Sequence, residues 1–275
     1  MDQQALKIDP LHKVWDPDTR IGDMLKGKRG LIVGVANADS IAYGCAVKLR
    51  AFGAELALTY LNEKSKRFVE PLAAHIEASL LLPLDVEQPG ELEAVFKRIE
   101  AEWGQLDFVV HSIAFAPRAD LHGRVVDCSK DGFLQAMRVS CYSFIEMARL
   151  AEPLMKNGGT LLTMSYYGAD KVVNHYNVMG PVKSALQATT RYLAAELGEK
   201  GIRVYAVSPG PLKTRAASGI ADFDELVDAA VKRSPAHRLV DIAEVGRVAA
   251  FLVGGAASGM TGDTIYVDGG LHNVA

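Results

Sequence analysis

The sequence predicts a single α/β domain in which a doubly wound parallel sheet is covered by helices on both faces. Strand-length apolar runs alternate with helix-length amphipathic segments along most of the chain. The apolar runs are continuous rather than alternating, as burial on both faces of a parallel sheet requires. No internal repeat, low-complexity segment or linker interrupts the 275 residues, and large α/β folds often use this length for one domain.

The sequence between each pair of successive predicted strands is long enough to form the crossover connection that parallel strands need. Crossovers between parallel strands are right-handed, and they place successive helices over the sheet. We expect strands over residues 29–36, 54–61, 79–86, 106–114, 159–166, 202–210 and 262–270.

The segments between the strands have the length and amphipathic pattern of helices, and Gly53 suits the end of the first one. Residues 1–22 are polar with both signs of charge, so we expect an N-terminal extension ahead of a domain that spans residues 23–275. The predicted helices cover residues 40–53, 63–78, 90–104, 143–158, 185–201 and 243–255.

Composition excludes several classes of function. A formal net charge of -3 offers no basic footprint for nucleic acid, and no Lys/Arg block indicates a membrane surface. The chain begins without the basic and apolar segments of a signal peptide, and no run of 18 apolar residues predicts a membrane span. We therefore expect a cytoplasmic protein.

The three cysteines, Cys45, Cys128 and Cys141, are far apart and form no CxxC pair. An odd number of isolated thiols argues against a disulfide framework or a zinc site, and fits a reducing compartment. We expect no metal.

A candidate ligand site begins at the end of the first predicted strand. Ligands of such sheets bind outside the carboxyl ends of the strands. Gly34 permits a tight turn there, and Ser40 is placed to cap the next helix, whose amino end favours a pyrophosphate. The turn is not GxGxxG, so by itself it is equally consistent with an ordinary loop.

Three further strand ends strengthen this interpretation. Asp85 and Val86 follow the third strand, where a carboxylate and a backbone amide could meet an adenine. Ser112 and Ala114 follow the fourth, where small residues let the backbone approach a ligand. The stretch 208–214, "SPGPLKT", has the glycine and prolines of a shaped loop. Four such ends in register indicate a dinucleotide site.

The stretch from Tyr166 to Lys183 carries the candidate chemistry. A phenol and a lysine together can donate a proton and bind an oxyanion, although tyrosines also fill core edges and lysines coat helices. Tyr176 and Lys183 are seven apart, which aligns them along a helix. Pro181 is tolerated only in the first turn, so Tyr176 is expected just before the helix. Tyr167 is expected only to pack.

From about residue 25 to the end, the chain resembles the enoyl-acyl-carrier-protein reductases of bacterial fatty-acid synthesis. These form a divergent branch of the short-chain dehydrogenase/reductase superfamily. Six residues separate Tyr176 from Lys183, and Tyr166 lies ten positions upstream, which is the specific signature of this branch. The matching stretches are "SIAYG", "HSIAFAP", "SYYGA", "YNVMGPVKSAL", "SPGPLKT" and "VDGG".

The resemblance implies a Rossmann domain with a small helical substrate lid over residues of about 215–232. It implies reduction of the C2–C3 double bond of a trans-2-enoyl thioester carried on acyl carrier protein, by a homotetramer. Tyr176 would donate to the developing enolate oxygen, Tyr166 would line the site and assist, and Lys183 would bind the nicotinamide ribose. Ala116 would contact the acyl side, as would both tyrosines.

The same resemblance implies which residues contact the cofactor. Leu61 departs from the family, which often has a polar residue there. No arginine follows directly to hold a 2′-phosphate, although Lys64, Lys66 and Arg67 are nearby. We therefore expect NADH, with NADPH as the alternative. The implied cofactor contacts are Gly34, Ser40, Ile41, Leu61, Asp85, Val86, Ser112, Ile113, Lys183, Leu212, Lys213, Thr214, Arg215 and Ala216.

Two alternatives stay open. A short-chain carbonyl reductase or alcohol dehydrogenase would act on a C=O bond, but the long tyrosine–lysine spacing argues against it. A non-catalytic dinucleotide-binding sensor would not need Tyr166, Tyr176 and Lys183 together.

Overall fold

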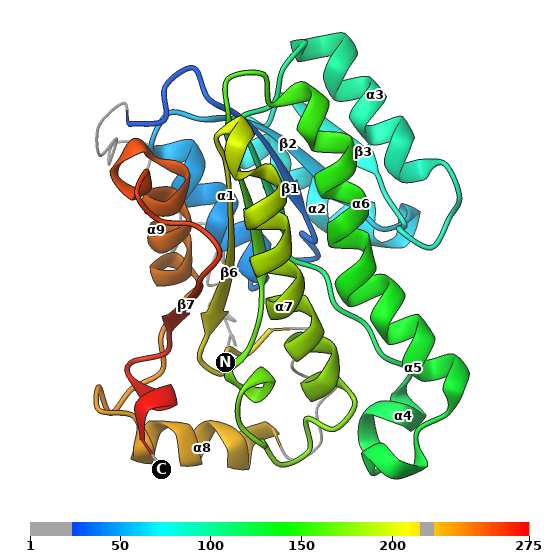
Figure 1. The fold of residues 1–275 in the computed structure, drawn as a ribbon, viewed down its shortest axis with the longest axis vertical. Coiled ribbons are helices and arrows are strands. Elements are labelled where there is room, and N and C mark those ends of the chain that lie inside the picture. The colour runs from blue at the N-terminus through cyan, green and yellow to red at the C-terminus, as the bar shows by residue number, and fades with distance from the viewer. Residues whose placement is uncertain (1–23, 215–222, 275) are drawn as a thin grey trace, which may run out of the picture.

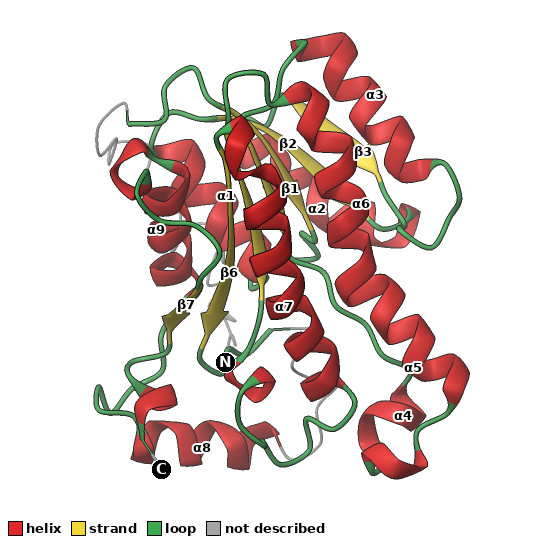
Figure 2. Ribbon diagram, in the orientation of Figure 1, coloured by secondary structure: helices red, strands yellow, loops and turns green. Residues whose placement is uncertain are grey.

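The computed structural model describes residues 24–214 and 223–274, and these form an α/β fold around one parallel sheet (Figures 1 and 2). The predicted extension over residues 1–22 and the first part of the predicted lid lie outside the described residues. All seven predicted strands are present within the predicted ranges. They are β1 (Arg29–Val33), β2 (Glu55–Tyr60), β3 (Leu80–Pro83), β4 (Phe108–His111), β5 (Gly159–Met164), β6 (Ile202–Pro209) and β7 (Thr264–Val267).

The strand order is β3-β2-β1-β4-β5-β6-β7, and every neighbouring pair is parallel. The chain winds outward from β1 to β3 on one side and from β4 to β7 on the other. This doubly wound topology is the predicted one. It leaves a crevice at the carboxyl ends of β1 and β4, where the direction of winding changes.

Helices cover both faces of the sheet, as predicted. One buried core joins the sheet to α1, α2 and α9, and a second joins it to α3, α6 and α7. The helices are α1 (Ile41–Ala51), α2 (Glu63–His75), α3 (Glu91–Trp103), α4 (Arg118–His122), α5 (Lys130–Met137), α6 (Ser143–Ala151), α7 (Met179–Leu197), α8 (Phe223–Arg233) and α9 (Ile242–Val253).

Local sequence signals explain where two of these helices begin. Asn62 before α2 accepts a hydrogen bond from the Ser65 amide, and the Ser65 hydroxyl accepts one from the Asn62 amide. Asp241 and Glu244 form the same reciprocal pair at α9. Each capping residue stabilises its helix by about 1 kcal/mol.

Helices α4 and α5 were not predicted from the sequence, and two further regions differ from the predicted helices. Helix α7 begins at Met179, six residues earlier than predicted, so Pro181 lies in its first turn and Tyr176 precedes it, as the proline requires. The predicted helix over 143–158 is shorter, and it continues α5 through a π-helical turn, Arg138–Tyr142. Short-range periodicity misses this junction because the turn shifts the apolar face between the two helices.

Candidate active site

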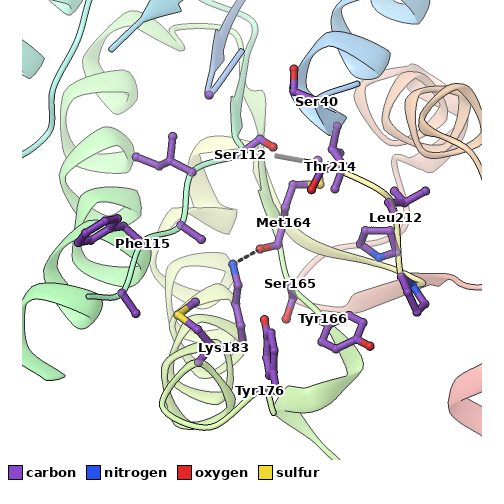
Figure 3. A pocket seen from close by; sticks show the side chains of 18 of the residues that line it. Ser40, Ser112, Phe115, Met164, Ser165, Tyr166, Tyr176, Lys183, Leu212 and Thr214 are labelled. Carbon is purple, nitrogen blue, oxygen red and sulfur yellow. Dashed lines mark hydrogen bonds between the residues drawn. The ribbon is translucent and has the colours of Figure 1, made fainter. Parts of the chain in front are cut away.

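A cavity of about 490 Å³ lies at the carboxyl ends of the central strands (Figure 3). Loops after β1, β4, β5 and β6 line it together with the amino end of α7 and Phe223 of α8. The predicted site residues that the structure brings together here are Gly34, Ser40, Ile41, Ser112, Ile113, Ala116, Tyr166, Tyr176, Lys183, Leu212 and Thr214.

The turn after β1 brings two strand ends into direct backbone contact. Gly34 has a φ of 107°, and a Cβ there would lie 2.1 Å from the carbonyl oxygen of Ser112. Ser40 occupies the N-cap position of α1 but makes no side-chain cap bond. Its hydroxyl donates to the Asn37 carbonyl at 2.6 Å and accepts from the Ala36 amide at 3.4 Å. Ser40 therefore shapes the turn instead of capping the helix, which corrects the predicted cap.

The backbone on both sides of Tyr176 is held in the left-handed region. His175 has a φ of 62° and Asn177 a φ of 44°, conformations that cost free energy for residues other than glycine. The Asn177 side-chain amide donates to the Leu121 carbonyl at 2.7 Å, which ties this segment to α4. The surrounding structure thus fixes the direction of the Tyr176 side chain just before α7.

The two candidate phenols pack against each other. The Tyr166 and Tyr176 rings lie 4.8 Å apart, inclined at 62°, and Tyr167 packs edge-on against Tyr166, as expected. Gly168 makes room for this arrangement, because a Cβ there would lie 2.6 Å from Cδ1 of Tyr176. Figure 3 shows Tyr176 and Lys183 lining the same cavity, with the Tyr166 hydroxyl pointing in another direction from the Tyr176 hydroxyl.

Burial raises the pKa of both phenols, and the neighbouring phenols of Tyr167 and Tyr176 raise the pKa of Tyr166 further. Both hydroxyls therefore stay protonated, as hydrogen-bond donors, at neutral pH. The Tyr166 hydroxyl is buried and has no hydrogen-bond partner within residues 24–214 and 223–274. A buried polar group of this kind is a candidate for binding a ligand.

Lys183 reaches the same cavity from the first turns of α7. Its side chain is 5% exposed, and Nζ donates to the carbonyl oxygen of Met164 at 2.6 Å (Figure 3). Burial lowers the pKa of Lys183 to about 8, and the Cys141 thiol opposes this shift. An ammonium held against one carbonyl keeps further N–H groups for a ligand.

A neutral histidine supports the floor of the site. His111, at the end of β4, bonds to Thr163 through Nδ1 and to Ser143 through Nε2, each at 2.8 Å. Because the Ser143 hydroxyl donates to the Val139 carbonyl, Nε2 must be the protonated nitrogen. Burial, and next the charge of Lys183, lowers the pKa of His111 to about 3, so the ring carries no charge.

Three predicted cofactor contacts lie at the same edge of the sheet but outside the cavity lining. Leu61 follows β2 and is 55% exposed. The Asp85 carboxylate accepts from the Glu87 amide at 2.9 Å, and the Asp85 amide donates to Glu91. Val86 packs against the core beside α3. Contacts of Leu61, Asp85 and Val86 with an adenosine stay predictions.

The loop after β6 is only partly described. Leu212 and Thr214 line the cavity, whereas the exposed Lys213 side chain is paired with Asp224 of α8 at 3.3 Å. The predicted contacts of Arg215 and Ala216 lie outside the described residues.

Sequence reasoning missed several residues of the lining. Met164 is the last residue of β5 and Ser165 follows it, so the rule about strand ends that identified Ser112 would also have found them. Contacts from the helices carry no comparable local signal. Ala114, which the sequence placed at the end of the fourth strand, also lines the cavity. The other lining residues that were not singled out individually are Ala36, Phe115, Arg118, Leu121, Met179, Pro209, Gly210, Pro211 and Phe223.

Two further observations concern other kinds of site. In the described parts of the chain, no three His, Cys, Asp or Glu side chains are grouped so that they could hold a metal ion. None of the helices that the structure describes has the length and apolar character needed to cross a membrane.

Known proteins match this chain over most of its length. The sequence profile described as enoyl-(acyl carrier protein) reductase matches residues 34–272. The chain belongs to this family. Enoyl-(acyl-carrier-protein) reductase (NADH) 1 of Rhizobium meliloti strain 1021 is 48% identical over 251 residues, which are 91% of this chain and 92% of that protein.

Solved structures of enoyl-(acyl carrier protein) reductases share the fold. The Anaplasma phagocytophilum enzyme in complex with NAD has a TM-score of 0.90 and 48% identity, covering 94% of this chain and 98% of that one. The Bacillus cereus enzyme, with NADP+ and indole naphthyridinone, has a TM-score of 0.90 and 44% identity, covering 92% and 99%.

Proposed function

We propose that this protein reduces the C2–C3 double bond of trans-2-enoyl thioesters on acyl carrier protein, with NADH as hydride donor, in fatty-acid elongation. The observation that carries this proposal is the convergence of Tyr176, Tyr166 and Lys183 on a cavity at the switch point of the sheet. Membership of the reductase family supports it.

The residues around the cavity fit a nicotinamide dinucleotide. Gly34 leaves space at the end of β1 that the Cβ of any other residue would fill. It also begins the turn that leads into the amino end of α1, and the amino end of a helix favours phosphate. Ser112 and Ile113 are placed beside this turn. Lys183 supplies a buried donor for the ribose hydroxyls. When bound, the nicotinamide supplies a hydride to C3 of the enoyl group.

Tyr176 is proposed as the donor to the thioester oxygen. Hydride addition at C3 moves negative charge onto that oxygen as an enolate, and a preaimed donor stabilises this charge by several kcal/mol. The raised pKa of Tyr176 keeps its phenol protonated at neutral pH, so that it can donate to this oxygen. Tyr166 lies against Tyr176 and assists. The proton for C2 comes from a water or a tyrosine.

The acyl side of the site is formed by Ala116 and its neighbours. Phe115, Ala116 and Leu121 belong to the apolar part of the lining, and Phe223 contributes from α8. Helix α8 lies within the predicted lid, and its buried Val227 and Ala230 belong to its apolar face. We assign this end to the acyl chain and the lid role to residues of about 215–232.

The end of β2 favours NADH over NADPH. Glu63 begins α2 two residues beyond Leu61, and Tyr60 and Lys66 both contact its carboxylate. A carboxylate here repels a 2′-phosphate, whereas it tolerates the ribose hydroxyl of NADH. Since the Bacillus cereus relative was solved with NADP+, both cofactors belong in the assay.

We also propose a cytoplasmic homotetramer. Strand β7 is the last strand of the sheet within the described residues, so its outer edge has no strand partner there, and Phe251 of α9 is 42% exposed. Light scattering coupled to size exclusion measures the subunit number, and a monomer at micromolar concentration would contradict this assembly.

A spectrophotometric assay tests the activity. We expect the absorbance of NADH to fall when crotonyl thioester is added, and to fall faster than that of NADPH under the same conditions. A 3-ketoacyl thioester serves as the competing substrate, because its preferred reduction would indicate a carbonyl reductase. Cofactor binding without turnover of any enoyl thioester would indicate a sensor and overturn the proposal.

A further inference from the structure

The π-helical turn Arg138–Tyr142 joins α5 to α6 behind the wall of the cavity. Such turns insert one extra residue into a helix, and they occur frequently at functional sites. Three consecutive residues of this turn, Val139, Ser140 and Cys141, are buried. The turn therefore presents side chains to the interior that a regular helix would place elsewhere.

Ser140 forms a reciprocal pair of hydrogen bonds with one residue of the loop after β4. Its Oγ accepts from the Phe115 amide at 2.9 Å and donates to the Phe115 carbonyl at 3.1 Å. Ser140 is 0% exposed, so its own hydroxyl is shielded from water. Loss of the hydroxyl would leave a donor and an acceptor of the loop without partners.

The loop over residues 113–116 has little else to hold its backbone. The Ser112 amide donates to Val33 of β1 before it, and the Asp120 amide donates to Pro117 after it. Between these points, Ser140 makes the only backbone hydrogen bonds of the loop within the described parts of the chain. All four loop residues line the cavity.

The turn itself is anchored firmly enough to act as a support. The Ser143 hydroxyl donates to the Val139 carbonyl and accepts from His111, which bonds in turn to Thr163 of β5. The π-helical turn is thereby connected to two central strands of the sheet. A side chain that extends from it can fix the loop relative to Lys183 and Tyr176.

We propose that Ser140 is a positioning residue that holds the Phe115 peptide, and with it the wall of the cavity between the cofactor and acyl ends. Its kinetic consequence rests on the proposed reductase function. Ser140 is not among the residues that line the cavity. It acts through Ile113 and Ala116, whose backbones it keeps at a set distance from the reacting groups, and small errors in such distances slow catalysis.

The substitution Ser140→Ala tests this role. We expect KM for crotonyl thioester to rise about tenfold and kcat to fall, because the Phe115 amide and carbonyl lose the partner that holds them. Hydrogen exchange at the amides of residues 113–116 should accelerate. This second measurement requires no activity, so it distinguishes failure of the positioning role from failure of the proposed function.

Thr190→Val is the matched control. Thr190 is also 0% exposed, but its hydroxyl bonds only to the Leu186 carbonyl within α7. We expect parental kinetics and unchanged loop exchange in this variant. If Ser140→Ala does not fold, Ser140→Cys, with a thiol of similar shape and weaker hydrogen bonding, takes its place and should show the same changes in smaller measure. Parental KM and unchanged exchange in the folded variant would overturn the proposal.

Discussion

The two ends of the same sheet use their polar groups in opposite ways. At the amino end, the Arg203 guanidinium donates to Thr160 Oγ1 at 3.0 Å and to the Val253 and Gly254 carbonyls at 3.2 and 3.3 Å. Lys28 pairs there with Asp107 at 2.8 Å. These groups surround a cavity of about 130 Å³ and bind one another across it.

At the carboxyl end of the sheet, polar groups retain hydrogen-bond donors that a ligand could use. Lys183 is bound to a single carbonyl, and the Tyr166 hydroxyl has no partner in the described structure. The backbone beside Tyr176 is held in unfavourable conformations. Internal pairing stabilises the amino end, whereas the carboxyl end retains unpaired donors and strain that a bound ligand would use. Substitutions at the two ends should therefore have separable effects.

The largest expected effect is that of Tyr176→Phe. We expect kcat to fall about 100- to 1000-fold, because the developing enolate loses its aimed donor. The dissociation constant for NADH should change less than about twofold, since the phenol is assigned to the substrate. Steady-state kinetics and NADH fluorescence titration measure the two quantities.

Tyr192→Phe is the control, because Tyr192 lies on α7 and is 72% exposed. If Tyr176→Phe keeps the kcat of the parent protein, Tyr176 is not the donor to the enolate oxygen. The proposed functional difference between the two ends of the sheet would then lose its main support.

Lys183→Ala should have the next largest effect. We expect the dissociation constant for NADH to rise about 10- to 100-fold, because a charged group donates the lost hydrogen bonds. Lys97→Ala, at an exposed position on α3, serves as the control. Equal NADH affinity in Lys183→Ala and the parent protein would contradict the assignment of Lys183 to the cofactor.

The pH dependence of NADH binding sharpens this prediction. The pKa of Lys183 is lowered to about 8 by burial, so the ammonium loses its proton as pH rises through that value. If NADH binds the protonated form, affinity is constant below pH 8 and weakens about tenfold per pH unit above it. Lys183→Ala should bind NADH weakly with no such dependence. A flat profile in the parent would show that the charge of Lys183 is not needed.

The smallest expected effect is that of Thr160→Val at the amino end. The substitution removes an acceptor of Arg203 without changing side-chain shape, so the free energy of unfolding should fall by about 1 kcal/mol. Urea unfolding measures the loss. The values of kcat and KM should match those of the parent, and a change in either would show that the two ends are coupled.

Much of the site could be predicted because strand ends are visible in a sequence. Gly34 and Ser112 follow apolar runs, and adjacent parallel strands place their ends at one edge of the sheet. The constraint that Pro181 imposes correctly placed Tyr176 before α7. The partner of the Ser40 hydroxyl was predicted wrongly, because a capping residue and a turn residue share the same local pattern.

The sequence by itself determined the doubly wound fold, since continuous apolar runs must be buried on both faces, and it determined the spacing of Tyr166, Tyr176 and Lys183. Only the tertiary structure decided which residues support them. Ser140 and Phe115 are separated by 25 positions, and their hydrogen bonds depend on how α5, α6 and β4 pack. Local patterns report burial and backbone preference, whereas a buried hydrogen bond between distant residues exists only once packing has brought them together.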